Sequence, residues 1–402
     1  MGKFRSRIRK FRFNRPQRIA ALLLFWLLLQ CGWVVAHQTL TERDYDYARC
    51  GREMWEKPSP LYGYFTSCGN IHDGTLGYRM AGLPLTLNLR AEQLLDHLRK
   101  PEERIFTGDE AGSSWELRHQ LTHMLLLIRL PFIALALLLG GAIWWVTRRL
   151  FGDLGGYTAT TLYCCSPAVI RAATMPGSEL LTAFALFGSL YTAIGVAHAL
   201  QGPRRKWNKR IYLLTILLGI LAASHIAALP LALFGALLMM AWLAEGRRSV
   251  ILPILLLASV GSILLLFASY AFQPDAFSYV FRSAAAMLWI SVNPARLYFT
   301  SSANIGITLA TAAALVLYFA HRRSRYFGNT SALVIAAILF LLITTGVAGQ
   351  PWFWAQPFLF TFIAGVFADA YDSPHGRLFR GAVASVLVLQ ALIGALALGS
   401  LT

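Results

Sequence analysis

Long apolar runs recur along most of this 402-residue chain, and they restrict its fold more than any other feature. The first run extends from Ile19 to Ala36, and others follow from about residue 125 onward. A helix of roughly 20 apolar residues is long enough to cross the hydrocarbon core of a membrane. Only 14% of the residues are charged, whereas soluble domains contain about 25%. The sequence therefore predicts an all-α, polytopic integral membrane protein.

The first apolar run has two interpretations, because a secretory signal peptide also combines a basic segment with an apolar one. Residues 1–18 are strongly basic, but no small-x-small cleavage site closes the run that follows them. We therefore interpret residues 19–36 as the first membrane helix.

The net charge of +17 indicates topology rather than nucleic-acid binding, because the basic residues cluster in short segments between apolar runs. Short basic loops face the cytoplasm in membrane proteins. This pattern predicts a cytoplasmic N-terminus and, for a chain this compact, a bacterial inner membrane. The basic clusters are residues 3–18, Arg148–Arg149, 204–210, Arg247–Arg248 and 322–325.

Basic clusters at both ends of a segment require an even number of crossings between them. Breaks at 171–179 and 224–230 divide two such segments into hairpins, although the second pair is short enough to be re-entrant. Two more hairpins, at 250–320 and 327–372, bring the hairpins to four. Two single helices precede them and one follows them, which gives about 11 crossings with a large first extracytoplasmic loop at 37–120. We divide the chain into a basic N-terminus (1–18), a transmembrane core (19–245) and C-terminal helices (246–402).

The cysteines agree with this sidedness. Cys50 and Cys68 both lie in the expected outer loop, where thiols are oxidised, and we predict a disulfide between them. Cys31, Cys164 and Cys165 fall within helices, where packing is the simpler role. No cysteine or histidine spacing is typical of a zinc site, and we assign no metal-ligating residues.

Most of the 19 acidic residues lie in the first outer loop. Asp44 and Asp46 follow the first helix closely, and a solvated loop explains them without any function. A carboxylate held at the membrane surface would also meet a substrate whose lipid stays in the bilayer.

Other polar residues are expected on the same outer face. Arg129 lies near the outer end of the second helix, where it either extends to the interface or binds an anionic head group. Arg171 and Glu179 flank the turn of the first hairpin, and His225 lies at the turn of the second.

Several segments together resemble a known class of membrane enzyme. Residues 128–194 begin with "IRLPF", contain "RRLFG" and "SP", and include a loop that leads to an acidic residue, Glu179. Residues 47–55, "YARCGREMW", resemble a helix that follows an acidic motif. These features resemble the GT-C class of glycosyltransferases, most closely the glycosyltransferase 39-like group that includes protein mannosyltransferases and aminoarabinose transferases.

The resemblance implies transfer of a sugar from a polyprenyl-phosphate donor to an extracytoplasmic acceptor. Asp44, with Asp46 in reserve, would be the catalytic base. Arg129 would lie near the lipid phosphate, Glu179 would be the second-loop acidic residue, and His225 stands where many members carry Lys. Alignment on Tyr47 places Arg43 and Asp44 where the group has an Asp-Glu pair.

The resemblance implies a lipid-linked sugar donor and membrane lipids as partners, no nucleic acid, and a glycan, lipid or protein acceptor that the sequence does not identify. The sequence identifies no definite cofactor, and it leaves a divalent metal open. A non-catalytic GT-C-like subunit of a membrane complex is the alternative. A transporter would need ionisable residues near helix centres, and almost none are found.

Overall fold

Helices account for nearly all of the secondary structure in the computed structural model. It describes residues 15–56, 74–99, 121, 123–202, 207–244, 246–274, 277–278, 288–344, 351–371 and 376–401. The helices are α1 (Arg15–His37), α2 (Glu42–Glu56), α3 (Leu76–Arg99), α5 (Leu125–Cys164), α6 (Pro167–Thr174), α7 (Ser178–Leu200), α8 (Trp207–Ser224), α9 (Ala228–Leu243), α10 (Ile251–Ser269), α12 (Asn293–Thr300), α13 (Ile305–Ala320), α14 (Phe327–Phe340), α15 (Pro351–Tyr371) and α16 (Gly376–Leu401).

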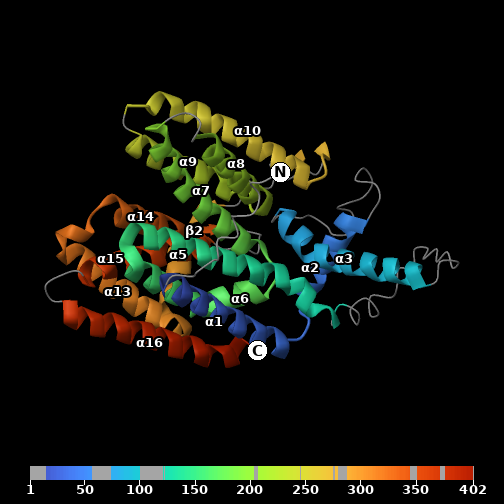
Figure 1. Ribbon diagram of the computed structural model, residues 1–402, viewed down its shortest axis with the longest axis horizontal. Helices are drawn as coiled ribbons and strands as arrows, with labels where there is room; N and C mark the ends of the chain where they lie inside the picture. Colours follow the sequence, from blue (N-terminus) through green and yellow to red (C-terminus); the bar gives the residue numbers. More distant parts are fainter. Residues whose placement is uncertain are drawn as a thin grey trace, which may run out of the picture.

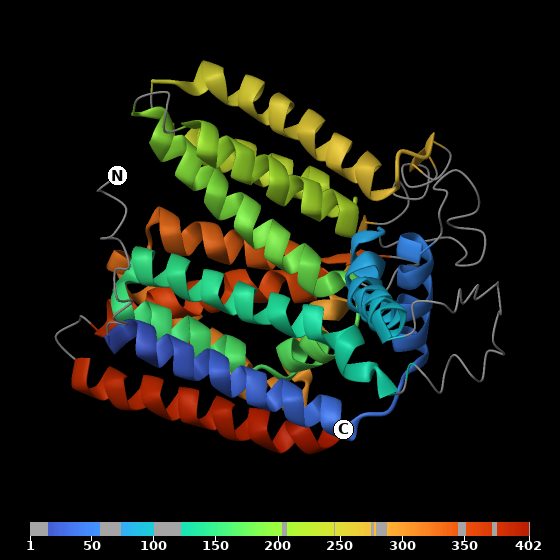
Figure 2. The same ribbon diagram turned by 45° about the vertical axis from the view of Figure 1, so that its right-hand side comes forward.

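The long helices lie side by side in one bundle, which confirms the expected all-α polytopic membrane fold (Figures 1 and 2). Within the described residues, six helical segments are long and apolar enough to span a membrane. They are Pro16–His37, Leu125–Cys164, Ser178–Leu200, Arg248–Ser269, Ser302–Ala320 and Pro351–Tyr371. Three shorter apolar segments, Ala228–Leu243, Phe327–Phe340 and Val383–Gly399, add to these six in the part of the chain that the structure describes.

The breaks between crossings fall where the sequence predicts them. α6 ends at Thr174 and α7 begins at Ser178, so the chain turns within 171–179. α8 ends at Ser224 and α9 begins at Ala228, which confirms the second break. A further reversal divides α5 at Gly152, whose φ of 77° is a left-handed conformation that glycine adopts at little cost.

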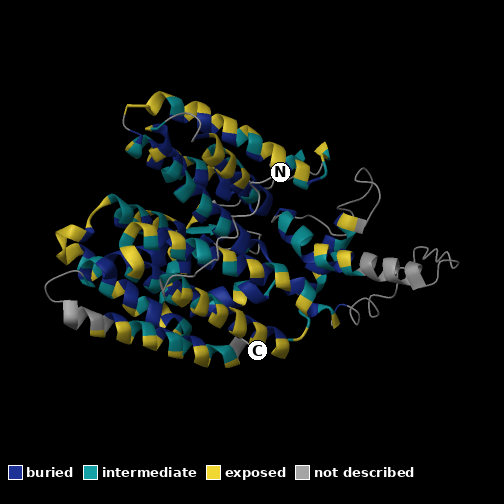
Figure 3. Ribbon diagram, in the orientation of Figure 1, coloured by how far each residue is buried: buried dark blue, intermediate teal, exposed yellow. Residues whose placement is uncertain are grey.

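The core of the bundle is centred on α15. In the apolar stretch of this helix, 94% of the residues are buried. The helices that pack against it include α5, α7, α13, α14 and α16. The sequence of α15 is apolar on every side, and such a helix belongs in an interior. Exposed positions gather instead on the outer helices, where apolar side chains face the expected lipid (Figure 3).

α2 and α3 lie together at one end of the bundle, so part of the expected outer loop is helical (Figure 2). The sequence predicts a helix at 47–55, but α2 begins earlier, at Glu42, and a second helix, α3, begins at Leu76. The two helices cross at Gly51 and Gly82 with backbone in contact. Arg79 of α3 joins the pair to α10 by donating from Nε to the carbonyl of Ser269 at 2.9 Å.

One short antiparallel sheet was not predicted. β1 (Leu288–Ile290) pairs with β2 (Leu342–Thr344), and Trp289 lies opposite Ile343. β1 lies in a segment expected to connect two helices, whereas β2 lies in a segment expected to be the end of a membrane helix.

The α2–α3 crossing should not tolerate a methyl group. A Cβ at Gly82 would lie 2.1 Å from the carbonyl carbon of Gly51, so Gly82→Ala must separate the helices. We expect this overpacking to cost about 1–3 kcal/mol locally. Limited proteolysis in detergent should then cut α2 and α3 faster than in the wild type. Gly32→Ala in α1 is the control because a Cβ there meets nothing within 4 Å; equal cleavage of both variants would contradict the prediction.

Candidate functional site

The start of α2 is held by a reciprocal capping arrangement. The backbone N–H of Thr41 donates to Asp44 Oδ2 at 3.0 Å, and the backbone N–H of Asp44 donates to Thr41 Oγ1 at 3.2 Å. The Thr41 hydroxyl also donates to Asp44 Oδ2 at 2.7 Å. Such contacts satisfy backbone donors that a helix start leaves without partners. The capping residues therefore explain why α2 begins where it does.

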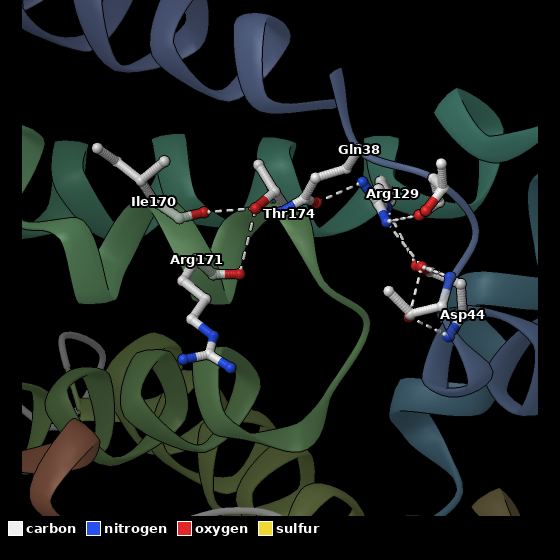
Figure 4. A network of polar contacts seen from close by, with 8 residues as sticks. Gln38, Asp44, Arg129, Ile170, Arg171 and Thr174 are labelled. Atoms are coloured by element: carbon white, nitrogen blue, oxygen red, sulfur yellow. Dashed lines mark hydrogen bonds and ion pairs between the residues drawn. The ribbon is translucent and has the colours of Figure 1, made fainter. Parts of the chain in front are cut away.

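The carboxylate of Asp44 is fully buried and contacts Arg129 of α5. Arg129 Nε lies 3.1 Å from Asp44 Oδ1 and Nη2 lies 2.7 Å from Oδ2, while both side chains are 0% exposed. Arg129 Nη1 also donates to Gln38 Oε1 at 2.7 Å, so the guanidinium is enclosed by acceptors (Figure 4). A two-point contact of this kind fixes the relative orientation of both groups.

A second ion pair joins α2 to α7. Arg43 Nη2 lies 2.8 Å and 2.7 Å from the two carboxylate oxygens of Glu179. This pair is partly exposed, with 31% of the Arg43 side chain and 21% of the Glu179 side chain accessible. Burial lowers the pKa of Arg43, but the Glu179 carboxylate and Tyr47 raise it, and the net shift is upward.

The surroundings of this second pair are aromatic and closely packed. The Arg43 guanidinium lies 5.8 Å from the centroid of the Tyr47 ring, and Tyr47 stacks on Tyr78 with centroids 4.0 Å apart. A Cβ at Gly177 would lie 2.1 Å from Glu179 Oε2 and 2.2 Å from Arg43 Nη2. Only glycine leaves room for the ion pair against the turn between α6 and α7.

The structure groups the predicted site residues differently from the sequence analysis. Asp44 contacts Arg129, and Glu179 contacts Arg43, a residue that had been noted only as a departure from the family pattern. Asp46 is exposed on α2, one turn after Arg43. The signal that could have found Arg43 is its position directly before a capping aspartate.

Arg171 and His225 stand apart from the two ion pairs. Arg171 is exposed near the end of α6, and its guanidinium has no hydrogen bond or ion pair with a described residue (Figure 4). His225 is 1% exposed between α8 and α9, and its ring lies 4.8 Å from that of Trp354 between centroids. Neither ring nitrogen of His225 has a hydrogen-bond partner in the described part of the chain.

The cysteine and metal expectations are only partly covered by the described residues. Cys50 is disulfide-bonded, whereas Cys31, Cys164 and Cys165 are buried free thiols. Cys68 lies outside the described residues, so its pairing with Cys50 stays a prediction. Among the residues that the structure describes, no group of three or more His, Cys, Asp or Glu side chains could hold a metal ion.

The fold has a solved counterpart. No family model and no curated protein matches the sequence. The crystal structure of ArnT from Cupriavidus metallidurans in the apo state superposes with a TM-score of 0.59 at 16% sequence identity. The match covers 94% of this chain, and this chain spans 63% of the length of the ArnT chain. The chain therefore shares the fold of this ArnT structure over the part that the match covers.

Removing one partner of the buried pair should cost more than removing both charges. Arg129→Gln leaves the Asp44 carboxylate buried without a cation, and we expect a loss of about 3–5 kcal/mol. Adding Asp44→Asn to the Arg129→Gln variant removes that charge and keeps a capping acceptor. The double variant should therefore be more stable than the Arg129→Gln single variant. Thermal unfolding in detergent measures the stability of the single and the double variant. Asp153→Asn, in an exposed pair with Arg148, is the matched control.

The partly exposed pair should depend on Gly177. Arg43→Gln and Glu179→Gln should show non-additive effects on thermal unfolding, because each removes the same contact. In a Gly177→Ala background the added methyl group separates the two side chains, so the effects should become additive. Coupling that persists in that background would contradict the proposed packing.

Proposed function

We propose that this chain is a membrane glycosyltransferase that uses a lipid-linked sugar donor. The observation that carries the proposal is the ArnT-like fold, which extends over 94% of the chain. The two ion pairs add support, because they hold α2 against α5 and α7 at the end of the bundle where α3 also lies. A polar surface at that end would face the head group of a lipid-borne donor.

In this proposal the site faces the extracytoplasmic side. Arg129 contacts α2 at one end of α5, and Arg149 follows 20 residues later on the same helix. At 1.5 Å per residue these positions are about 30 Å apart, which is the thickness of the hydrocarbon core. The Arg148–Arg149 cluster would therefore lie at the opposite end of α5 from α2, and short basic loops of this kind face the cytoplasm.

The proposed roles follow from exposure. Asp44 is sealed against Arg129, so we assign it to positioning α2. Asp46 is exposed one turn from Arg43 and is our candidate for the base that deprotonates the acceptor hydroxyl. Arg171 offers an exposed cation that would stabilise the leaving phosphate. Glu179 would orient Arg43 at the same surface.

A non-catalytic GT-C-like subunit is the second candidate function. The observation that favours it is that two carboxylates of the site, Asp44 and Glu179, are each bound at two points by an arginine. A carboxylate whose oxygens already accept from an arginine would have to break that contact before it could accept a proton from a substrate hydroxyl. If Asp46 has no catalytic role either, the arrangement would support binding without transfer.

Sugar transfer in proteoliposomes decides between these functions. A panel of polyprenyl-phosphate sugars would be offered to the wild type and to Asp46→Asn, with Asp153→Asn as a control at the other end of the bundle. We expect Asp46→Asn to lower kcat by about 100-fold or more, as loss of a general base does, and the control to match the wild type.

Binding of polyprenyl phosphate supplies the second readout. A wild type that binds the lipid but transfers no sugar from any donor supports the non-catalytic subunit. A wild type that neither binds nor transfers overturns the proposed use of a lipid-linked donor.

A further inference from the structure

The break between α5 and α6 interrupts a helix inside the bundle. α5 ends at Cys164 and α6 begins at Pro167, which has no backbone N–H to donate. The N–H of Ser166 bonds back to the carbonyl of Tyr163, and the N–H of Val169 bonds to Ser166. The carbonyls of Cys164 and Cys165 therefore receive no backbone donor from the described residues.

Two glutamines from distant helices supply the missing donors. Gln30 Nε2 of α1 donates to the carbonyl of Cys164 at 3.0 Å, and Gln390 Nε2 of α16 donates to the carbonyl of Cys165 at 2.8 Å. The two glutamines are 3% and 0% exposed. Gly394, one turn after Gln390, allows the approach, because a Cβ there would lie 2.6 Å from the Cys165 carbonyl oxygen.

The depth of these contacts makes them energetically important. Gln30 lies seven residues before the end of α1, which is about 10 Å along the helix axis. Its position lies within the span Pro16–His37, where water is not expected to satisfy a free carbonyl. Non-helical backbone at this depth persists only where neighbouring helices provide hydrogen bonds.

α6 connects this break to the candidate site. It has eight residues and carries Arg171 near its end, and the following turn leads to Gly177 and Glu179. A shift at its buried start would therefore move the exposed cation at the other end. α16 and α1 both pack on α6, so they can hold it from two sides.

We propose that Gln30 and Gln390 are positioning residues, which hold α6 and thereby set the place of Arg171 in the site. The inference rests on the proposed function, because Arg171 is assigned there to the leaving phosphate. It goes further by naming two side chains, remote in sequence and buried in the membrane region, on which donor handling depends.

The test has an arm that does not require activity. A nitroxide label on Ala172→Cys reports the mobility of α6 in proteoliposomes, and the protein without this added cysteine gives the background from its own thiols. Gln30→Met and Gln390→Met remove the donors at similar side-chain length. We expect the label to become more mobile in each. Thr311→Val is the matched control, because it removes a buried hydrogen bond confined to its own helix, α13.

The activity arm separates positioning from general destabilisation. Each Met variant should lower kcat/KM for the donor by about tenfold, within the hundredfold that a 1 Å misplacement can cost. In an Arg171→Gln background, the same Met substitutions should lower kcat/KM little further, because the arginine that the glutamines position has already been removed. If a Met variant does not fold, Gly394→Ala displaces the Cys165 carbonyl instead.

Unchanged label mobility in the folded variants would overturn the proposal. Losses that multiply with Arg171→Gln would also overturn it, because they indicate a structural role alone. If the wild type transfers no sugar, the proposed function fails, while the label still decides whether the glutamines hold α6.

Discussion

The buried contact between Arg129 and Asp44 is the interaction on which the arrangement at this end of the bundle depends. Both side chains are fully buried, and moving two charges out of water is costly unless each is bound at several points. Here the guanidinium meets Asp44 twice and Gln38 once. The pair thus joins α5, the segment after α1, and the first turn of α2. Because Arg43 directly precedes Asp44, the same contact determines where Arg43 can reach.

Three arginines together attach α2 and α3 to three different helices of the bundle. Arg129 binds α2 from α5, Arg43 extends from α2 to α7, and Arg79 extends from α3 to the carbonyl that ends α10. Arginine suits this role because its planar group donates in several directions at once. The contacts differ in exposure, since the Arg129 pair is sealed and the Arg43 pair is partly open to solvent. Water and ligands can therefore reach the contact with α7 more readily than the contact with α5.

The fold was largely predictable because membrane helices depend on local features: apolar length, basic loops and breaks at Pro and Gly. The candidate site was less so. Thr41 and Asp44 form a local capping pattern that the sequence displays, yet the partner of Asp44 is 85 residues away. Which face of α2 turns inward depends on the contact between Gly51 and Gly82, a tertiary feature. The β1–β2 pair joins segments too short to show a strand pattern.

Burial divides the polar residues of this region into two sets with different chemical capacity. Asp44 and Arg129 have satisfied each other, and Gln30 and Gln390 have satisfied the backbone. Such groups define geometry, because any movement would leave a buried polar atom without a partner. Asp46 and Arg171 are exposed and bind no described residue. A ligand can contact such groups without first breaking an internal bond. The rigid set lies inside and the available set lies at the surface, so a ligand at this end of the bundle would meet free polar groups on a fixed framework.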